Sequence, residues 1–396
     1  MIKVLRIINR FNLGGPTYNA ALLTKHLPAD RYETLLVGGE KDESEGSSLH
    51  ITQYLGLDPI IIPEMKREIS PKDDYKSYKR ICNLIEEFKP DIVHTHASKA
   101  GTVGRLAARK MKVPGIVHTF HGHVFHSYFS KAKTTFYKHI EKRLAKSSSK
   151  IIAISDIQKH ELGTIHKICP PEKISVIPLG FDLTKFKANQ EIKRNLFRSK
   201  YKIKDNEIAV GIIGRLVPIK NHELFLNAAS TALQKTSQKV KFFIVGDGEL
   251  MNCLLKKADE LNFVISKPGE INEKANLFFT SWITDMDHVV AGVDLVALSS
   301  KNEGTPVSLI EAQAGNRSVI STNVGGIENV IENGKTGLLS KNEDVQGFAD
   351  NLLTLLEDHK LRQELGENGW VNVGQRFHYD RLANNIDQLY TEILNK

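Results

Sequence analysis

Cysteine is rare in this sequence of 396 residues: Cys82, Cys169 and Cys253 are far apart and odd in number. They therefore predict neither a disulfide framework nor a cysteine metal cluster, and they favour a cytoplasmic protein. Long apolar runs are missing as well, because no stretch reaches the roughly 20 residues that a membrane-spanning helix needs. Residues 1–8 are too short and too charged for a signal peptide, and they predict a first strand instead.

Two further signals are missing. The loop that contains Gly15 does not follow the G-x-G-x-x-G pattern, which disfavours a nicotinamide-dependent dehydrogenase. That loop is compatible both with a tight turn and with a segment that faces a phosphate or sugar. No nucleic-acid recognition module accompanies the formal net charge of +8, so a nucleic-acid partner is not expected. The apolar share of 41% and the charged share of 25% are typical of a folded globular protein, and the length allows two domains.

What the sequence does contain is a regular alternation of short apolar runs and helical patterns, which predicts parallel sheets covered by helices. In the first half the predicted strands are 3–8, 34–37, 60–62, 92–94, 115–120, 151–154 and 174–177, and the helices are 17–27, 74–88, 99–111 and 132–146. In the second half the strands are 208–213, 241–245, 277–280, 293–298 and 319–322, and the helices are 223–234, 250–260, 306–314 and 344–356.

One charged stretch, 185–206, interrupts this alternation and is predicted to be an interdomain linker with a short helix. The fold class is therefore α/β, with two Rossmann-like, doubly wound parallel-sheet domains facing a central cleft. The domains are expected at 1–184 and 207–375. The tail, 376–396, carries an amphipathic helix that can pack on either domain.

The strongest functional signal is the stretch 299–311, directly after a predicted buried strand. The chain breaks at Glu303, and Thr305 is predicted to cap a new helix whose first residue is Pro306. Such a helix start offers unpaired N–H groups and a partial positive charge, which suit a diphosphate. Glu303 and Glu311 flank this anion site and can accept hydrogen bonds from sugar hydroxyls. Together these groups indicate a nucleotide-sugar site.

Two cations follow the first strand of the second half. Arg215 offers a planar fork for phosphate oxygens and Lys220 a mobile point charge, and both can reach one diphosphate. The alternative is a pair of solvated loop cations, but their place at the carboxyl end of a strand favours ligand binding. Two weaker candidates follow later strands: Gly246 permits close approach to the nucleotide, and the backbone around Ile283 can meet a base edge.

Two possible metal sites are considered and set aside, so no metal is expected. Asp285 and Asp287 match a bare D-x-D pattern, but Asp285 is better explained as the N-cap of a helix. A cluster of histidines lacks a cysteine or acidic residue that would complete a site, and its members are His118, His121, His123 and His126. We instead predict that His121 holds a sugar hydroxyl. His94 and His96, near the preceding strand end, are predicted to be structural.

A basic segment follows these histidines. Its cations, opposed only by Glu141, are Lys131, Lys133, Lys138, Lys142, Arg143, Lys146 and Lys150. The apolar residues recur at helical spacing, which predicts a helix docked on the core with a solvated basic face. The alternative is that Lys131–Lys150 rests on anionic lipid at the inner face of a membrane, which contributes about 1 kcal/mol per cation near the surface.

Together these segments resemble the retaining glycosyltransferases of family 4, which have the GT-B fold, over nearly the whole chain. The shared motifs, in chain order, are N-L-G-G-P (12–16), P-D-I-V-H-T-H (90–96), H-T-F-H-G-H (118–123), I-A-I-S (152–155), V-I-P-L-G-F-D (176–182), G-R-L-V-P-I-K-N (214–221), V-G-D-G (245–248) and N-E-G-T-P-V-S-L-I-E (302–311). One departure is Pro16-Thr17-Tyr18, where many members have an acidic residue.

The resemblance implies a role for each candidate. Arg215 and Lys220 would bind the donor diphosphate, Glu311 the ribose hydroxyls, and Glu303 the transferred sugar. Backbone contacts to phosphate and sugar would come from Gly304, Thr305, Pro306 and Val307. His121 would touch the donor sugar, and Gly15 would close over the diphosphate. The last helix would cross back to the first domain.

The implied activity is the transfer of a sugar from a nucleotide diphosphate, expected to be UDP, with retention of configuration and without metal. No residue stands out as a covalent nucleophile, which favours a front-face mechanism in which the departing phosphate takes the acceptor's proton. A lipid-linked glycan of a bacterial surface polysaccharide is the expected acceptor. A nucleotide-sugar epimerase and a sugar phosphorylase remain alternatives, because both can share the two-domain layout.

Overall fold

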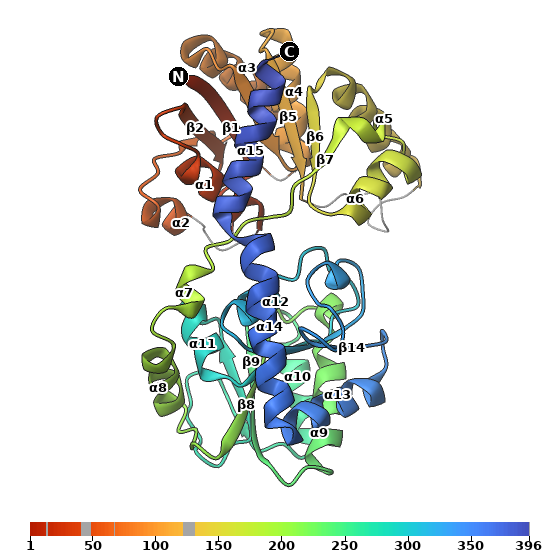
Figure 1. The fold of residues 1–396 in the computed structure, drawn as a ribbon. Helices are drawn as coiled ribbons and strands as arrows, with labels where there is room; N and C mark the ends of the chain where they lie inside the picture. The colour runs from red at the N-terminus through yellow and green to blue at the C-terminus, as the bar shows by residue number, and fades with distance from the viewer. Residues whose placement is uncertain (13–14, 41–48, 67, 122–130, 396) are drawn as a thin grey trace. The chain divides into compact units, whose positions relative to one another are not determined.

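The computed structural model describes residues 1–12, 15–40, 49–66, 68–121 and 131–395. The chain divides into two compact units, Met1–Phe181 together with Phe377–Lys396, and Asp182–Arg376. Each unit contains a seven-stranded sheet, and the strand pairs within both sheets are parallel. Helices pack on these sheets (Figure 1). The prediction of two doubly wound α/β domains is therefore confirmed.

In the first unit the strands lie in the order β3-β2-β1-β4-β5-β6-β7. Their bounds are β1 (Ile2–Arg10), β2 (Tyr32–Gly39), β3 (Ile60–Ile61), β4 (Ile92–His96), β5 (Gly115–Phe120), β6 (Lys150–Ala153) and β7 (Ile174–Val176). The chain adds β2 and β3 on one side of β1 and then returns to place β4 on the other side. Open sheets of this kind bind ligands at the carboxyl ends of the strands, where the order reverses.

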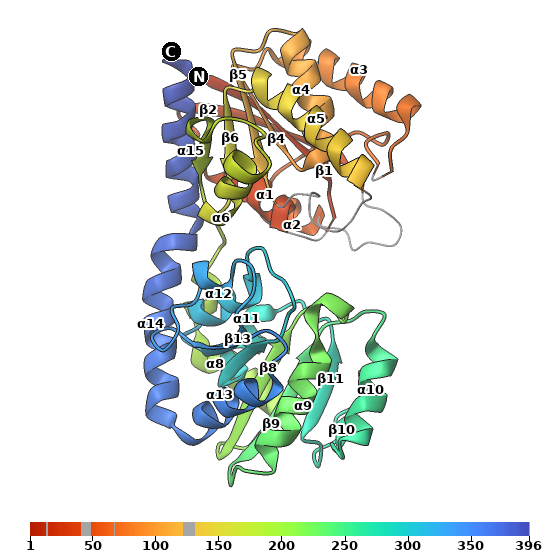
Figure 2. The ribbon, with the colours of Figure 1, turned by 90° about the vertical axis from the view of Figure 1, so that its right-hand side faces the viewer.

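The helices of the first unit cover both faces of its sheet, and they are α1 (Gly15–His26), α2 (Leu49–Tyr54), α3 (Pro71–Phe88), α4 (Ser98–Lys110), α5 (Lys131–Ser147), α6 (Asp156–His160) and α15 (Tyr379–Leu394). Alternate residues of β1 face opposite sides. Leu5 packs in one apolar cluster with Val103 of α4, whereas Val4 packs in another with Ile386 of α15. The last helix of the chain therefore belongs to the first unit (Figure 2).

The second unit repeats this plan with the strand order β10-β11-β9-β8-β12-β13-β14. Its strands are β8 (Glu207–Ile213), β9 (Lys239–Val245), β10 (Ile265–Ser266), β11 (Leu277–Ser281), β12 (Leu295–Leu298), β13 (Ser318–Thr322) and β14 (Leu338–Ser340). Its helices include α9 (His222–Leu233), α10 (Met251–Glu260), α12 (Val307–Ala314), α13 (Val345–Glu357) and α14 (His359–Phe377). The order reverses between β8 and β12, so this is where a ligand is expected in the second unit.

Residues 185–206 were predicted to be a linker, but the structure places them within the second unit, since the first unit ends at Phe181. They form most of α7 (Thr184–Lys187) and all of α8 (Gln190–Lys200), and α8 packs on α11 (Met286–Gly292). Phe197 of α8 is buried. Some of the charges in this stretch form ion pairs with the rest of the second unit, such as Arg194 with Asp294 at 2.7 Å.

One long helix, α14, was not predicted. Three glycines interrupt its pattern, and glycine in a helix interior disfavours the helical conformation by roughly 1 kcal/mol relative to alanine. The structure shows what one of them permits: a Cβ at Gly366 would lie 2.3 Å from the carbonyl oxygen of Asn316. The glycine thus lets the helix backbone approach the loop before β13 closely.

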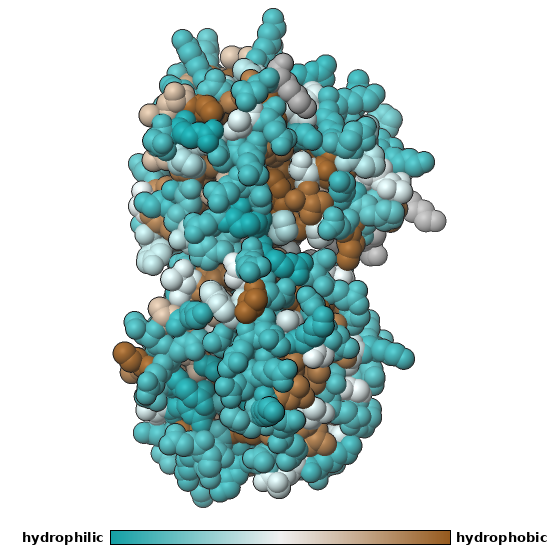
Figure 3. All heavy atoms as spheres, viewed as in Figure 1, coloured by the Kyte–Doolittle hydropathy of each residue, from teal (hydrophilic) through white to brown (hydrophobic). Residues whose placement is uncertain are grey.

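Hydrophilic side chains cover most of the surface in the view of Figure 3, and hydrophobic ones gather in small patches among them. No helix in the described part of the chain combines the length and the apolarity that crossing a lipid bilayer requires.

Candidate active site

The strongest sequence candidates of the second unit meet where its strand order reverses. Arg215 and Lys220 lie on the loop after β8, and Glu303 and Gly304 lie on the loop after β12. Because β8 and β12 are neighbours in the sheet, their carboxyl ends open at the same edge. Residues 83 positions apart in the sequence are thereby brought into contact.

An ion pair joins these two loops. The Lys220 ammonium donates to Oε1 of Glu303 at 2.6 Å, and the two side chains are only 24% and 10% exposed. The Ser300 hydroxyl donates to the same oxygen at 2.6 Å. Both bonds use Oε1, which leaves Oε2 of Glu303 to accept a hydrogen bond from a substrate hydroxyl.

Two buried serines at the end of β12 hold the loops in register, and sequence reasoning assigned neither of them a role. The Ser299 hydroxyl donates to the carbonyl oxygens of Lys220 and Asn221, at 3.1 and 2.9 Å. Ser300 fixes the Glu303 carboxylate. The available signal was a pair of hydroxyl side chains at the carboxyl end of an apolar strand, where a buried polar group needs a partner.

Arg215 differs from Lys220 because it is exposed and its side chain forms no hydrogen bond or ion pair with another described residue. Its loop is nevertheless fixed, since the amide of Leu216 donates to the carbonyl oxygen of Asp247 at 2.9 Å. Gly246 has a φ of 149°, and a Cβ there would lie 1.9 Å from the carbonyl oxygen of Gly214. Glycine is therefore needed at position 246 because the backbone there packs directly against the backbone of Gly214. The backbone around Arg215 is therefore fixed, whereas its guanidinium is free to bind a ligand.

The backbone of Gly304 packs against Gly326 on one side and has open space on the side where a Cβ would point. A Cβ at Gly326 would lie 1.8 Å from the carbonyl oxygen of Gly304, and the Gly326 amide donates to the Glu303 carbonyl oxygen at 2.9 Å. A Cβ placed on Gly304 itself would meet nothing within 4 Å. This open side can admit a ligand close to the backbone.

The helix that follows starts one residue later than predicted. Pro306, and not Thr305, is the N-cap of α12, and no side chain caps the helix. A proline ring fixes φ but offers no capping oxygen, so the first turn begins at Val307. The amides of Leu309 and Ile310 donate to the Pro306 carbonyl oxygen at 3.1 and 3.2 Å, whereas those of Val307 and Ser308 have no acceptor in the described part of the chain. These two amides and the partial positive charge of the helix start suit an anion.

Glu311 lies in the second turn of α12. Burial raises the pKa of its carboxyl from 4.5 to about 7, against the opposing field of Lys185 and with a smaller contribution from Asp287. The side chain is therefore divided between its neutral and ionised forms at neutral pH. A group that binds ribose hydroxyls at this position can accept a hydrogen bond in either form and donate one when protonated.

The D-x-D pattern does not form a site of its own in the structure. Asp285 is at the N-cap position of α11 as predicted, but its side chain forms no capping bond. Asp287 pairs with Lys193 at 2.8 Å. Burial alone would raise the pKa of Asp287, but the hydrogen bond and charge of Lys193 lower it below its usual value. Among the described residues, no group of three or more histidine, cysteine or acidic side chains is arranged to hold a metal ion. Ile283 lies nearby, after β11, and is partly exposed.

In the first unit, histidines lie at the carboxyl edge of the sheet, where the second unit has the ion pair of Lys220 and Glu303. His96, at the end of β4, and His121, just after β5, are joined by a hydrogen bond of 2.9 Å between Nδ1 of His96 and Nε2 of His121. The His96 ring also stacks on His94, with centroids 4.3 Å apart. His123 and His126 lie outside the described residues, and Gly15 is the first residue of α1.

A series of buried hydrogen bonds fixes the ring of His94, on which His96 stacks. Nδ1 of His94 lies 2.6 Å from the Tyr390 hydroxyl, and Nε2 lies 2.7 Å from the Thr119 hydroxyl. The Arg6 guanidinium donates to Tyr390 at 3.2 Å. Since Tyr390 belongs to α15, the last helix helps to order the histidines.

These histidines are neutral. Burial lowers the pKa of His121 to about 3. It lowers the pKa values of His94, His96 and His118 well below 6.5 as well, with neighbouring arginines and histidines adding to the effect. Nδ1 of His121 is buried and has no hydrogen-bond partner among the described residues. His121 can therefore offer this nitrogen to a neutral hydroxyl, whereas the second unit offers charge.

Comparison with known families matches both halves of the chain. Residues 193–370 match the model of "Glycosyl transferases group 1", and residues 13–185 match that of "Glycosyltransferase Family 4". Among curated relatives, an Escherichia coli UDP-Gal:alpha-D-GlcNAc-diphosphoundecaprenol alpha-1,3-galactosyltransferase is 33% identical over 350 residues, which is 87% of each chain. The capsular polysaccharide biosynthesis glycosyltransferase CapM of Staphylococcus aureus is 26% identical over 359 residues, 89% of each chain.

Comparison with solved structures agrees on the fold. Anabaena HepE, crystallised in complex with UDP, superposes with a TM-score of 0.80 over 99% of this chain and 100% of that chain, at 20% identity. At this level of identity the match concerns the fold alone.

Proposed function

This chain belongs to the group 1 and family 4 glycosyltransferases, and we propose that it moves a sugar from a UDP-sugar to a lipid-linked glycan with retention of configuration. The E. coli relative, which is 33% identical to this chain over 350 residues, carries in its name a UDP-linked donor and a diphosphoundecaprenol-linked acceptor. The S. aureus relative is named for capsular polysaccharide synthesis. The first name supports a lipid-linked acceptor for this chain, and the second supports a role in polysaccharide synthesis.

The observation that carries the proposal is the ion pair of Lys220 and Glu303 at the reversal point of the second sheet. A cation suited to phosphate and a carboxylate suited to sugar hydroxyls stand in contact, beside the open backbone of Gly304 and the start of α12. A nucleotide sugar has its diphosphate and its sugar adjacent in the same way. An oxygen of the incoming diphosphate would take over the Lys220 ammonium, and Glu303 would turn to the sugar.

The reaction then places demands that these groups meet. The bond between the anomeric carbon and the diphosphate breaks, and the departing diphosphate gains negative charge. Arg215, Lys220 and the first amides of α12 are placed to stabilise that charge. Positive charge develops on the sugar ring, as in other glycosyl transfers, and the Glu303 carboxylate opposes it. The acceptor oxygen attacks from the same face, and its proton passes to the departing phosphate oxygen. From the first unit, His121 and Gly15 are assigned to the donor by the family resemblance.

The test is to incubate the protein with a panel of UDP-hexoses and a GlcNAc-diphospholipid acceptor. We expect UDP release that depends on both substrates, and a product whose anomeric coupling in NMR matches that of the donor. An inverted product would overturn the retaining mechanism. Interconversion of the donor without acceptor would indicate an epimerase, and a requirement for free phosphate would indicate a phosphorylase.

A further inference from the structure

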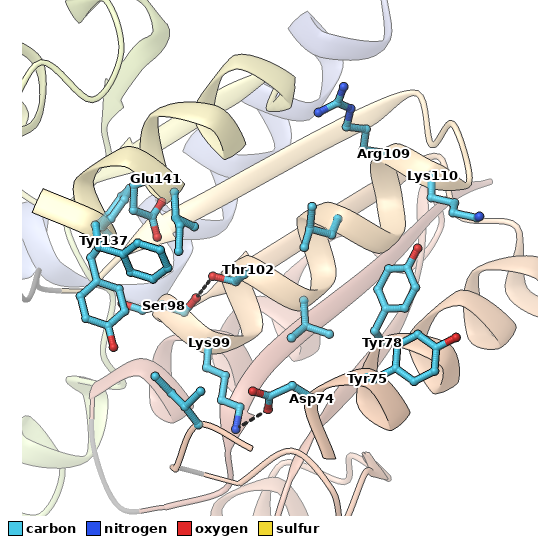
Figure 4. A pocket seen from close by; sticks show the side chains of 16 residues that line it. Asp74, Tyr75, Tyr78, Ser98, Lys99, Thr102, Arg109, Lys110, Tyr137 and Glu141 are labelled. Atoms are coloured by element: carbon cyan, nitrogen blue, oxygen red, sulfur yellow. Dashed lines mark hydrogen bonds and ion pairs between the residues drawn. The ribbon is translucent and has the colours of Figure 1, made fainter. Parts of the chain in front are cut away.

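A cavity in the first unit takes no part in this reaction as described above. It has a volume of about 870 Å³ and lies between α3, α4 and α5 (Figure 4). Apolar and aromatic side chains form most of its wall, including Ile69, Tyr75, Tyr78, Leu106, Phe136 and Ile140. This volume is within the range of small-molecule sites, roughly 300–1,000 Å³.

Several of these apolar side chains are unusually exposed for their type. Leu106 is 44% exposed and Phe136 62%, although the two belong to different helices and line the same cavity. Ile69, at another side of it, is 69% exposed. Single exposed apolar residues are common, but a cluster around one hollow marks a surface that binds something apolar.

The rim of the cavity is basic. Arg109 and Lys110 stand at the C-terminal end of α4, where Figure 4 shows them at the opposite end of the helix from Lys99. Lys99 is neutralised by Asp74 at 2.6 Å, whereas Arg109 and Lys110 form no recorded ion pair with another described residue. Cations therefore stand at both ends of α4, and the wall between them is mostly apolar.

The position of α4 connects the cavity to the strand ends. Ser98 opens α4 directly after β4, so that end of the cavity lies beside His96 and, through it, His121. From there α4 extends for 13 residues, about 20 Å at the usual rise. A lipid diphosphate bound along α4 would have its diphosphate at the Ser98 end, beside Lys99 and the edge of the sheet where substrates are expected, and its hydrocarbon chain would extend toward Arg109 and Lys110.

We propose that this cavity binds the polyprenyl chain of the lipid-diphosphate acceptor. This inference rests on the proposed function, which supplies a lipid-linked acceptor, and it adds the place where the lipid is held. A protein helix is a poorer occupant. Since an α-helix is about 10 Å across, one as long as α4 would need nearly twice the volume of the cavity. An extended hydrocarbon chain fits the same space.

The experiment uses farnesyl diphosphate, a short isoprenoid diphosphate, below the concentration at which it forms micelles. Its binding to the full-length protein is measured by equilibrium dialysis in saturating UDP, which occupies the donor site. We expect saturable binding to one site per chain. Leu106→Glu and Phe136→Glu should each weaken it at least tenfold, because they place a charge in the apolar wall.

The matched control is Ile157→Glu, since Ile157 is 45% exposed on α6 and lies outside the cavity. It should bind farnesyl diphosphate as the unaltered protein does, and thermal unfolding should show all three variants folded. Equal affinities for the Leu106→Glu and Ile157→Glu variants would overturn the proposal. So would full displacement by inorganic diphosphate, which would mean that only the head group is bound.

Anionic phosphatidylglycerol vesicles provide a further arm. If the cavity variants lost vesicle binding but kept farnesyl diphosphate binding, the surface would dock on a bilayer and the proposal would be wrong. Binding of UDP is followed separately in every variant. A protein that fails to bind UDP contradicts the proposed function, whereas one that binds UDP but not farnesyl diphosphate contradicts this inference alone.

Discussion

The two units share one topology and differ in what they present at the carboxyl edge of the sheet. In each, the order reverses beside the first strand, next to β4 in one unit and β12 in the other. The first unit places buried, neutral imidazoles there, such as His96 and His121. The second places a contacting cation and carboxylate, Lys220 and Glu303. The chemistry of each edge therefore depends on side chains at strand ends and not on the fold.

The difference matches the two halves of a glycosyl transfer. A diphosphate leaving group needs fixed positive charge, and the second unit supplies it. An uncharged sugar hydroxyl and a hydrocarbon chain need hydrogen bonds and apolar surface, and the first unit offers His121 and the cavity along α4. Substitutions at either edge should therefore affect different steps.

The largest effect is expected for Lys220→Ala. It removes the cation for the leaving phosphate and leaves Glu303 without its ion-pair partner. We expect kcat/KM to fall about a hundredfold or more, the usual cost of losing one stabilising donor in the transition state. Initial rates of UDP release provide the measurement. Lys301→Ala is the control. Lys301 is only two residues from Glu303 in the sequence, but its side chain is 46% exposed and pairs with Glu343. Near-normal turnover of the Lys220 variant would contradict the proposed site.

A smaller effect on kcat is expected from substitution of the histidines at the edge of the first sheet. His96→Phe keeps a ring for stacking on His94 but removes the hydrogen bond to Nε2 of His121. Loss of one such bond corresponds to roughly 1–1.5 kcal/mol, or about tenfold in kcat. Because His96 is not among the residues proposed to contact the diphosphate, such as Arg215 and Lys220, the affinity for UDP should not change.

His96→Gln tests whether the hydrogen bond is responsible. The amide can still reach His121, so this variant should recover most of the lost rate. If both variants were equally impaired, or if UDP affinity fell with kcat, His96 would be a packing residue. The proposed role of the histidine edge in the reaction would then be contradicted.

The partly buried carboxyl of Glu311 should affect stability more modestly, with a defined dependence on pH. Its folded pKa of about 7 exceeds the ordinary 4.5, so the folded state binds a proton more tightly than the unfolded state. Stability is then lost as pH rises from 4.5 through 7. Glu311→Gln removes this loss, and we expect the variant to be about 1 kcal/mol more stable than the unaltered protein at pH 8.5, since partial exposure reduces the effect.

The difference should vanish near pH 3, where the wild-type carboxyl is protonated in both states. Urea unfolding at several pH values measures it. Glu364→Gln, at an exposed position of α14, should show no comparable trend. A constant difference between Glu311→Gln and the unaltered protein across this range would mean that the side chain is ionised in the folded protein.

Much of this arrangement could be predicted from the sequence because it depends on local patterns. Apolar runs bounded by glycine and proline identify parallel strands, and the residues after them, such as Lys220 and Glu303, must lie at one edge. The contact between those two side chains depends on which strands are neighbours, and a strand list does not determine that order. The roles of Ser299 and Ser300 depend on the same information.

The remaining errors have local physical causes. The helix α14 was missed because its glycines serve close packing, as at Gly366, and resemble helix breakers in the sequence. Residues 185–206 are charged and interrupt the alternation, which predicts a linker, but ion pairs such as that of Arg194 with Asp294 join them to the second unit. The cavity along α4 could not be anticipated, because its walls come from three helices whose packing is a tertiary property.

The smallest effect is expected from chelation, and it tests whether the charged edge acts alone. In the second unit Lys220, Arg215 and the start of α12 provide positive charge where a divalent ion would otherwise be needed to stabilise a diphosphate. Asp287, half of the D-x-D pattern, is engaged by Lys193. We therefore expect UDP release in excess EDTA to remain within about twofold of the untreated rate. Loss of activity that Mg²⁺ or Mn²⁺ restores would contradict this, and Asp287→Asn would then show whether the D-x-D pattern holds the ion. If chelation has no effect and Lys220→Ala is inactive, the protein's own cations account for the stabilisation of the leaving group.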